Sequence, residues 1–443
     1  MGNAKHKLPA KTATRQPPLR DQPYLFAHEL AQWEGCVLTT EIDKICQSVE
    51  MQRSSTRGVS RSVRRKIRFA AEWVVNCLIQ TEEALPAAWL AIGQSSEYYR
   101  PKGPLRGEFG YEIVVKRVIP VLESLGWATI RHGFNDPDKN NSFITRMRAR
   151  GDLKRAICAN LYCWQPLTMC SKGLILLFDG KKENRHLLPT PKTTTVDTWE
   201  YWLYEYNQFL SEHAIALAVP DDELKRLAKR RTAKDFDFET AERRKPVINY
   251  RAIALKRLFA RGRLDRGGRF YGGWWQIVPS EYRPYIRINH KSTVEWDFSS
   301  MALRLLYALE KVNPPTGDLY DLGIPDKATA RPIIKKYIQV LLNDEDNRFK
   351  SSGLKLKSIG MTRTDLHELV LKRHPIIEPH LNTDIGLQLQ FTESEIAFRV
   401  MRKMMHEHKV AVLPVHDSFL VRLGYEKHLQ QEMADAFETE TGQ

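Results

Sequence analysis

The segment from Val410 to Arg422 constrains the fold of this chain more than any other. Apolar, β-forming residues flank the pair His416-Asp417 on both sides. That pattern predicts a β-hairpin with the two polar residues at its tip. An Asp after an apolar strand is often only a turn residue, so this segment alone is weak evidence for a functional site. A second segment that places another Asp at the end of a strand strengthens it.

The second segment is Thr293 to Ala308, and it reads as a strand followed by a helix. Residues 293–297 alternate in polarity, and Ser299 is a suitable N-cap for a helix whose apolar residues recur at helical spacing. Asp297 is therefore expected where the strand ends and the helix begins.

Two carboxylates placed in this way favour a two-metal site. Mg²⁺ is a hard cation that takes carboxylate and phosphate oxygens together. Such sites activate an attacking hydroxyl and stabilise a leaving oxygen. We therefore expect Asp297 and Asp417 to be ligands of two Mg²⁺ ions, for which Mn²⁺ can substitute.

Taken in order, the segments resemble the palm of family A DNA polymerases and of the related single-subunit phage-type RNA polymerases. Asp297-Phe-Ser-Ser-Met-Ala-Leu-Arg is similar to motif A, and Val415-His-Asp-Ser-Phe to motif C. The resemblance implies that Asp297 and Asp417 bind the metals and are catalytic. Ser418 is the form seen in the RNA polymerases, whereas many DNA polymerases have Glu there.

Between these segments, Arg331-Pro-Ile-Ile-Lys335 resembles motif B of the fingers. At i and i+4 both cations lie on one helical face and can bind one triphosphate, and Pro332 fits the first position of that helix. Taken alone, Arg-x-x-x-Lys is a common pattern on exposed helices. The resemblance implies that Lys335 is also the general acid for pyrophosphate.

The resemblance further assigns nucleotide-binding positions to His416, Gln339 and Ala302. Gln339 stands where the family has an aromatic residue of the fingers helix. Ala302 stands where family A DNA polymerases have the Glu that excludes the ribose 2′-hydroxyl. We therefore expect this chain to accept ribonucleotides, as a primer-making enzyme would.

Upstream, Gly262-Arg-Leu264 with Gln276-Ile-Val-Pro279, and Asp265 to Tyr271, resemble the stretches that contact template and primer. The resemblance covers about Leu255 to Arg422. It implies nucleic-acid contacts at five positions: Arg263, Arg269, Tyr271, Gln276 and Gln390.

The formal net charge of +15 points to a polyanionic partner, although a charged and solvated surface is the simpler alternative. From Arg53 to Arg68 there are seven basic residues and no acidic one. Because like charges repel unless an anion offsets them, contact with phosphate is the better interpretation. We expect Arg64, Arg65 and Lys66 to bind nucleic acid.

A predicted helix over 110–126 is followed by two extended runs, 127–132 and 143–148. The order resembles a winged helix-turn-helix, in which a helix enters a groove and the wing contacts phosphates. Arg146 and Arg148 would lie on the wing and bind duplex DNA. A small α+β scaffold with an exposed basic strand is the alternative.

The expected fold class is α+β and multidomain: a winged-helix-like N-terminal region, a helical thumb-like segment, and a right-hand polymerase palm with an antiparallel sheet and short helical fingers. The expected boundaries are 1–23 for a flexible basic arm, 24–155 for the DNA-binding region, 156–247 for connector and thumb-like helices, and 248–443 for palm and fingers, with the fingers at about 310–386. Residues 235–245 are expected to form a linker.

The six cysteines favour reduced, idle thiols, because no Cys-x-x-Cys pair is present and the cluster at Cys158, Cys163 and Cys170 lacks a fourth ligand at a usual zinc spacing. No apolar stretch is long enough to span a membrane. We expect a cytoplasmic, nucleoid-associated protein with no membrane partner.

The expected function is therefore a template-directed nucleotidyltransferase, a DNA polymerase of the family A type without a proofreading exonuclease, acting on DNA and nucleoside triphosphates. One alternative is a DNA-binding replication initiator or regulator with a catalytically silent palm. Another is a metal-dependent nuclease using His416 and Asp417, which leaves Arg331 and Lys335 without a role.

Overall fold

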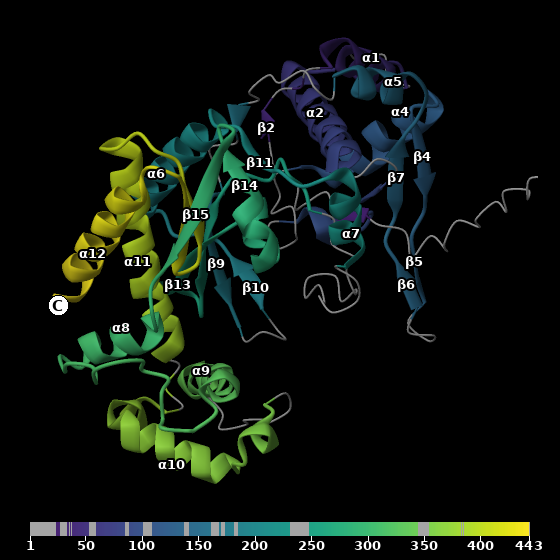
Figure 1. Ribbon diagram of the computed structural model, residues 1–443. Helices are drawn as coiled ribbons and strands as arrows, with labels where there is room; N and C mark the ends of the chain where they lie inside the picture. Colours follow the sequence, from purple (N-terminus) through teal and green to yellow (C-terminus); the bar gives the residue numbers. More distant parts are fainter. Residues whose placement is uncertain are drawn as a thin grey trace, which may run out of the picture.

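The computed structural model has a mixed α+β fold with several antiparallel sheets, which confirms the expected class (Figure 1). It describes the chain from Tyr24 to Gly442, except for residues 27–32, 35, 37, 53–58, 85–87, 101–108, 137–140, 161–167, 170–172, 181–184, 231–247, 344–353, 382 and 384. The expected basic arm at 1–23, the linker at 235–245, Cys163, Cys170 and the start of the basic run at Arg53 lie outside the described residues. None of the described helices has the length and apolarity that a membrane crossing requires.

A five-stranded sheet in the order β11-β14-β15-β17-β16 forms the centre of the C-terminal part, and every neighbouring pair in it is antiparallel. Its strands are β11 (Ile215–Leu217), β14 (Ile286–Ile288), β15 (Lys291–Asp297), β16 (Val412–Val415) and β17 (Ser418–Arg422). The hairpin predicted from the first sequence segment is confirmed as β16–β17, and the strand predicted from the second as β15.

A second sheet has the order β10-β9-β12-β13. Its strands are β9 (Ile175–Asp179), β10 (His186–Leu188), β12 (Lys256–Ala260) and β13 (Arg263–Tyr271). Strand β9 pairs with β12 in parallel, whereas the other two pairs are antiparallel. Both sheets therefore draw strands from either side of the boundary that we expected between residues 247 and 248.

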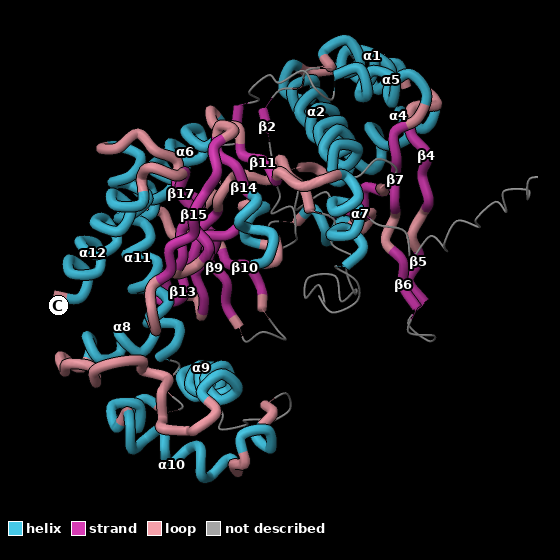
Figure 2. The backbone as a smooth tube through the Cα atoms, viewed as in Figure 1, coloured by secondary structure: helices cyan, strands magenta, loops and turns pink. Residues whose placement is uncertain are grey.

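Three long helices pack beside the central sheet: α6 (Thr194–Ser211), α11 (Ile385–His406) and α12 (Glu426–Thr441) (Figure 2). Their apolar faces belong to one large core with both sheets. The Tyr206 hydroxyl of α6 donates to the Val412 carbonyl of β16. Helix α6 lies in this core instead of forming a separate thumb, while α7 (Asp221–Arg230) follows it.

A helical lobe begins where β15 ends and lies beyond that end of the sheet (Figure 1). It contains α8 (Met301–Leu309), α9 (Lys327–Asn343), α10 (Arg363–Arg373) and two 3₁₀ turns at Leu356–Ile359 and Pro375–His380. Two expectations were wrong in detail. Ser300, not Ser299, precedes α8 and has a positive φ of 56°. Pro332 lies inside α9 because that helix begins at Lys327.

The N-terminal part has its own core, built from two helices, a helix–hairpin unit and a small sheet in the order β1-β3-β7-β4. Its elements are β1 (Tyr24–Phe26), β2 (Trp33–Glu34), α1 (Thr39–Met51), α2 (Arg61–Ala84), β3 (Trp89–Ala91), a 3₁₀ turn at Ser96–Tyr99, α3 (Tyr111–Ile113), a π-helical turn at Val114–Val118, α4 (Ile119–Ser124), β4 (Ala128–Arg131), β5 (Phe134–Asp136), β6 (Asn141–Phe143), β7 (Arg146–Ala149), α5 (Gly151–Asn160) and β8 (Thr168–Met169).

The helix predicted over 110–126 is confirmed with one irregularity. Pro120 has no N–H to donate to Lys116, and a π-helical turn precedes it. Gly126 follows the helix with φ of 66°, the left-handed conformation expected after a helix end. The predicted hairpin is confirmed by the antiparallel pairing of β4 with β7.

Candidate active site

Asp297 lies at the end of a strand, next to Asp417 in the turn of the neighbouring hairpin. Asp297 is the last residue of β15 and stands opposite Ser418, the first residue of β17. The Phe298 amide donates to the Asp417 carbonyl at 3.2 Å. His416 has φ of 58° and forms the tight turn between β16 and β17 with Asp417. The structure thus brings together two carboxylates that are 120 positions apart in the chain.

The electrostatics of Asp297 show that the two carboxylates interact. Partial desolvation and the negative charge of Asp417 raise the pKa of Asp297 to about 6, while the positive charge of Lys335 lowers it. Two carboxylates that repel each other in this way favour a bound cation, since a divalent ion would offset both charges. Their oxygen donors fit the hard Mg²⁺ ion that the sequence predicts.

A third carboxylate, Glu295, stands two residues before Asp297 on the same strand. Ser418 donates its hydroxyl to Glu295 Oε1 at 2.6 Å, and Arg283 forms an ion pair with the same oxygen. Glu295 was not among the residues predicted from the sequence, although the two-residue period of a strand places it on the same face of β15 as Asp297. Glu295 holds Ser418 in place, and its negative charge helps to raise the pKa of Asp297.

A fourth carboxylate, Glu393 of α11, is deeply buried and bound to Arg269 of β13. Arg269 donates through Nε and Nη2 to the two carboxylate oxygens, at 2.7 and 2.6 Å. Burial raises the pKa of Glu393, and Asp417 and Asp297 raise it further, whereas Arg269 lowers it. Arg269 is thus close enough to Asp417 to interact with it electrostatically. Two of its N–H groups, however, already donate hydrogen bonds to Glu393.

His416 and Tyr271 meet beside these groups, with ring centroids 5.4 Å apart. Burial lowers the pKa of His416, and the nearby cation Arg269 lowers it further. The Nδ1 atom of His416 is buried and has no hydrogen-bond partner within the described protein. An imidazole that is neutral at pH 7 and has one unused nitrogen is suited to a polar ligand.

The three residues predicted on the fingers helix share one exposed face of α9. Arg331, Lys335 and Gln339 follow each other at intervals of four residues, and all three are exposed. Lys335 is close enough to Asp297 to lower the pKa of that carboxylate. Arg331 pairs with Asp318, with Nε at 2.6 Å from Oδ2. Arg331 and Lys335 are therefore two exposed cations on the helical lobe that follows Asp297 in the chain.

Other predicted residues fall at the edges of this region. Ala302 is half-buried in α8, and Gln390 is half-buried in α11, close before Glu393. The side-chain amide of Gln276 donates to the carbonyls of Phe270 and Pro414, at 2.9 and 3.0 Å, so it braces β13 against β16. That bracing role was not indicated by the sequence.

Arg263 lies at the exposed start of β13 and pairs with Asp265 through two hydrogen bonds, at 2.8 and 2.6 Å. It is the predicted template-contacting residue nearest to the β12–β13 turn. The carboxylate already takes two of its donors.

The predicted nucleic-acid contacts of the N-terminal part divide into exposed and buried groups. Arg64, Arg65 and Lys66 are exposed near the start of α2, and Arg64 lies 3.3 Å from Glu50. Arg148 stacks on the Trp89 ring with its guanidinium 4.3 Å from the centroid. Arg146 is only 2% exposed, because β7 lies between β3 and β4. The prediction that Arg146 contacts phosphate at the protein surface is therefore wrong.

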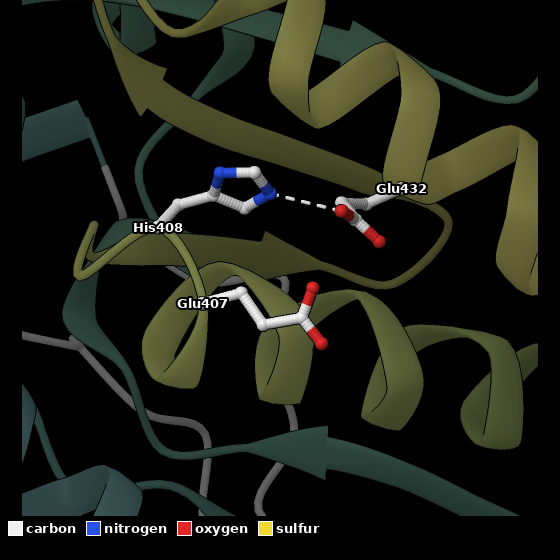
Figure 3. A group of neighbouring side chains, drawn as sticks. All are labelled: Glu407, His408 and Glu432. Carbon is white, nitrogen blue, oxygen red and sulfur yellow. Dashed lines mark hydrogen bonds and ion pairs between the residues drawn. The ribbon is translucent and has the colours of Figure 1, made fainter.

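A second group of possible metal ligands lies where α11 ends: Glu407, His408 and Glu432, with ligand atoms within 4.8 Å of one another (Figure 3). Lys403 forms an ion pair with Glu407 at 2.5 Å, and His408 lies 2.9 Å from Glu432. Both carboxylates already have protein partners. This group is therefore a weaker candidate for a metal site than the aspartate pair.

Comparison with family models, with curated proteins and with solved structures finds no match to this chain.

Proposed function

We propose that this chain is a template-directed nucleotidyltransferase of the family A DNA polymerase type. Its substrates would be nucleoside triphosphates and its partner a DNA template with a primer. One observation carries the proposal: Asp297, at the end of β15, lies beside Asp417, in the turn between β16 and β17, and Lys335 of the helical lobe acts electrostatically on Asp297. A nucleotidyltransferase needs this combination of paired carboxylates and phosphate-binding cations.

Each residue has a chemical task in this proposal. Asp297 and Asp417 would hold Mg²⁺. When bound, the ions would supply charge neutralisation and acidify the primer hydroxyl. Arg331 and Lys335 bind the triphosphate, and Lys335 gives a proton to the leaving pyrophosphate. Arg269 and His416 lie close to Asp417. Arg269 would contact the nucleic acid, and His416 would contact the nucleotide.

The arrangement of elements supports a palm with fingers. An antiparallel sheet carries the carboxylates at one end, and a helical lobe is inserted in the chain between its strands β15 and β16 (Figure 1). In the N-terminal part, a helix over 111–124 precedes the β4–β7 hairpin, and β3 lies beside β7. This order agrees with a winged helix and supports duplex binding.

Ala302 supports the use of ribonucleotides. A methyl side chain leaves more space than the Glu that the resemblance predicts at this position. We therefore expect the enzyme to incorporate rNTPs as well as dNTPs. A proofreading exonuclease would need its own set of catalytic carboxylates upstream of the palm. The sequence predicts no such set, so we also expect no proofreading.

The test is synthesis on a single-stranded DNA template with Mg²⁺, with and without primer, and with dNTPs or rNTPs. The wild type should give template-directed product, and Asp297→Asn and Asp417→Asn should give none. Asp435→Asn, an exposed residue of α12, is the matched control and should retain activity. Extension with dNTPs alone, even with Mn²⁺, would contradict the ribonucleotide part.

The same assay separates the alternatives. DNA binding without product in the wild type supports a replication initiator with a silent palm. Degraded template that depends on His416 and Asp417 supports a nuclease. Both metal-binding aspartates are present, and this favours catalysis over a silent palm.

A further inference from the structure

The guanidinium of Arg331 binds a carboxylate of the same chain, Asp318, through the edge that could otherwise bind a phosphate. Asp318, in the loop before α9, accepts hydrogen bonds from Nε at 2.6 Å and from Nη2 at 3.4 Å. The Tyr320 ring lies against the same guanidinium, with its centroid 5.2 Å away. Arginine binds carboxylate and phosphate with the same two-pronged geometry. The carboxylate therefore occupies donors that a phosphate would use.

The loop holds Asp318 in this position. The Tyr320 amide donates to Asp318 Oδ1 at 3.1 Å, and the Tyr320 side chain is 3% exposed. The hydrogen bond from Arg331 lowers the pKa of Asp318, so the carboxylate is ionised at neutral pH. The ionised Asp318 carboxylate is held in place by the Tyr320 amide, so it would compete with any other anion for Arg331.

We propose that Asp318 competes with the nucleoside triphosphate for Arg331 and has to release it before the nucleotide binds. This inference rests on the proposed function, since it concerns the same nucleotide site. Because the pair is exposed, with 46% of the Arg331 side chain and 37% of the Asp318 side chain accessible, a triphosphate can displace the carboxylate. The competition lowers affinity for nucleotide about two- to five-fold, the range expected from an exposed ion pair.

The chain supplies a matched control on the same loop. Asp321 pairs with Lys327 at 2.7 Å, one turn before Arg331 on α9. Asp318→Asn and Asp321→Asn each remove one negative charge from the loop. Asn at 318 keeps an oxygen that can accept from the Tyr320 amide. A difference between the two variants therefore reports the Arg331 contact and not the general charge of the loop.

The experiment is calorimetric titration of the full chain with a non-hydrolysable nucleoside triphosphate and Mg²⁺. We expect Asp318→Asn to bind it about two- to five-fold more tightly than the wild type, and Asp321→Asn to bind it equally. In an Arg331→Ala background, Asp318→Asn should change nothing, because the residue for which it competes is gone. Thermal melting confirms that each variant is folded.

Unchanged or weaker binding in Asp318→Asn would overturn the inference, as would an equal gain in Asp321→Asn. If the wild type still makes template-directed product, the proposed function survives that result. If the wild type binds no triphosphate and makes no product, both fail together.

Discussion

Arg269 of β13 and Glu393 of α11 form a two-pronged ion pair, with both hydrogen bonds at 2.7 Å or less. The neighbouring Arg257 binds the Gly268 carbonyl and the Ser394 hydroxyl, each at 2.8 Å. Two arginines therefore fasten β12 and β13 to consecutive residues of one helix. That helix leads into the hairpin that carries Asp417, so the ion pair fixes the strand of Tyr271 relative to the aspartates.

Replacing Glu393 with Gln should destabilise the fold by about 3 kcal/mol, since it leaves a partly buried guanidinium without its counter-charge. The Glu393 side chain is 6% exposed and that of Arg269 24% exposed. Urea unfolding measures the change. Arg263→Gln is the control, because the Arg263–Asp265 pair is exposed, and it should leave the midpoint unchanged. Equal midpoints for Glu393→Gln and wild type would show that the pair does not fasten the helix.

Asp297→Asn should stabilise the metal-free protein at neutral pH. The folded pKa of about 6 lies above the ordinary value of 3.8, so the folded state holds this proton more strongly. The contribution of Asp297 to stability therefore falls as pH rises from about 4 to about 6. In chelator at pH 7.5 we expect Asp297→Asn to melt about 2 °C above the wild type.

At pH 3 the melting difference should nearly vanish, because that pH lies below both the folded pKa of about 6 and the ordinary value of 3.8, so Asp297 is largely protonated in both states. Added Mg²⁺ should raise the melting temperature of the wild type but not of Asp297→Asn. Asp435→Asn serves as the control for loss of an exposed charge. A variant that melts below the wild type at pH 7.5 would contradict the repulsion between the aspartates.

Local pattern was enough to predict the elements that carry the aspartates. Apolar runs on either side of His416-Asp417 predicted β16–β17, and alternation before Asp297 predicted β15. Their pairing then followed from a resemblance, since no property of either segment alone says that they are neighbours. Gly126 likewise marked the end of its helix through a local conformational preference.

Contacts between distant segments could not be predicted in this way. Glu393 became part of the site only because α11 packs against β13, and Arg146 became buried only because β3 adds to the far side of β7. The placement of β9 beside β12 joins residues on either side of the expected boundary at 247. Each of these three positions depends on tertiary packing, which the periodicity of a single strand or helix does not predict.

Lys335→Ala should lower kcat about 100-fold or more if Lys335 donates a proton to pyrophosphate. Arg331→Ala should instead act mainly on KM for the nucleotide. Loss of Lys335 also removes a positive charge that lowers the pKa of Asp297, so the acid limb of the pH–rate profile should move to higher pH. Lys372→Ala, an exposed residue of α10, is the control. An unchanged kcat and pH profile would exclude Lys335 from catalysis.

Replacing Arg65 and Lys66 together with Ala should weaken binding of duplex DNA, because both are exposed near the start of α2. Each lost phosphate contact should make the plot of log affinity against log salt less steep by about 0.9. Fluorescence anisotropy with a labelled duplex at several salt concentrations measures both effects. The double variant Lys372→Ala/Lys427→Ala removes the same charge from exposed positions outside the N-terminal core and should keep the wild-type slope. If both double variants lose equal affinity, the +15 net charge acts as one diffuse surface and the N-terminal part has no duplex-binding face of its own.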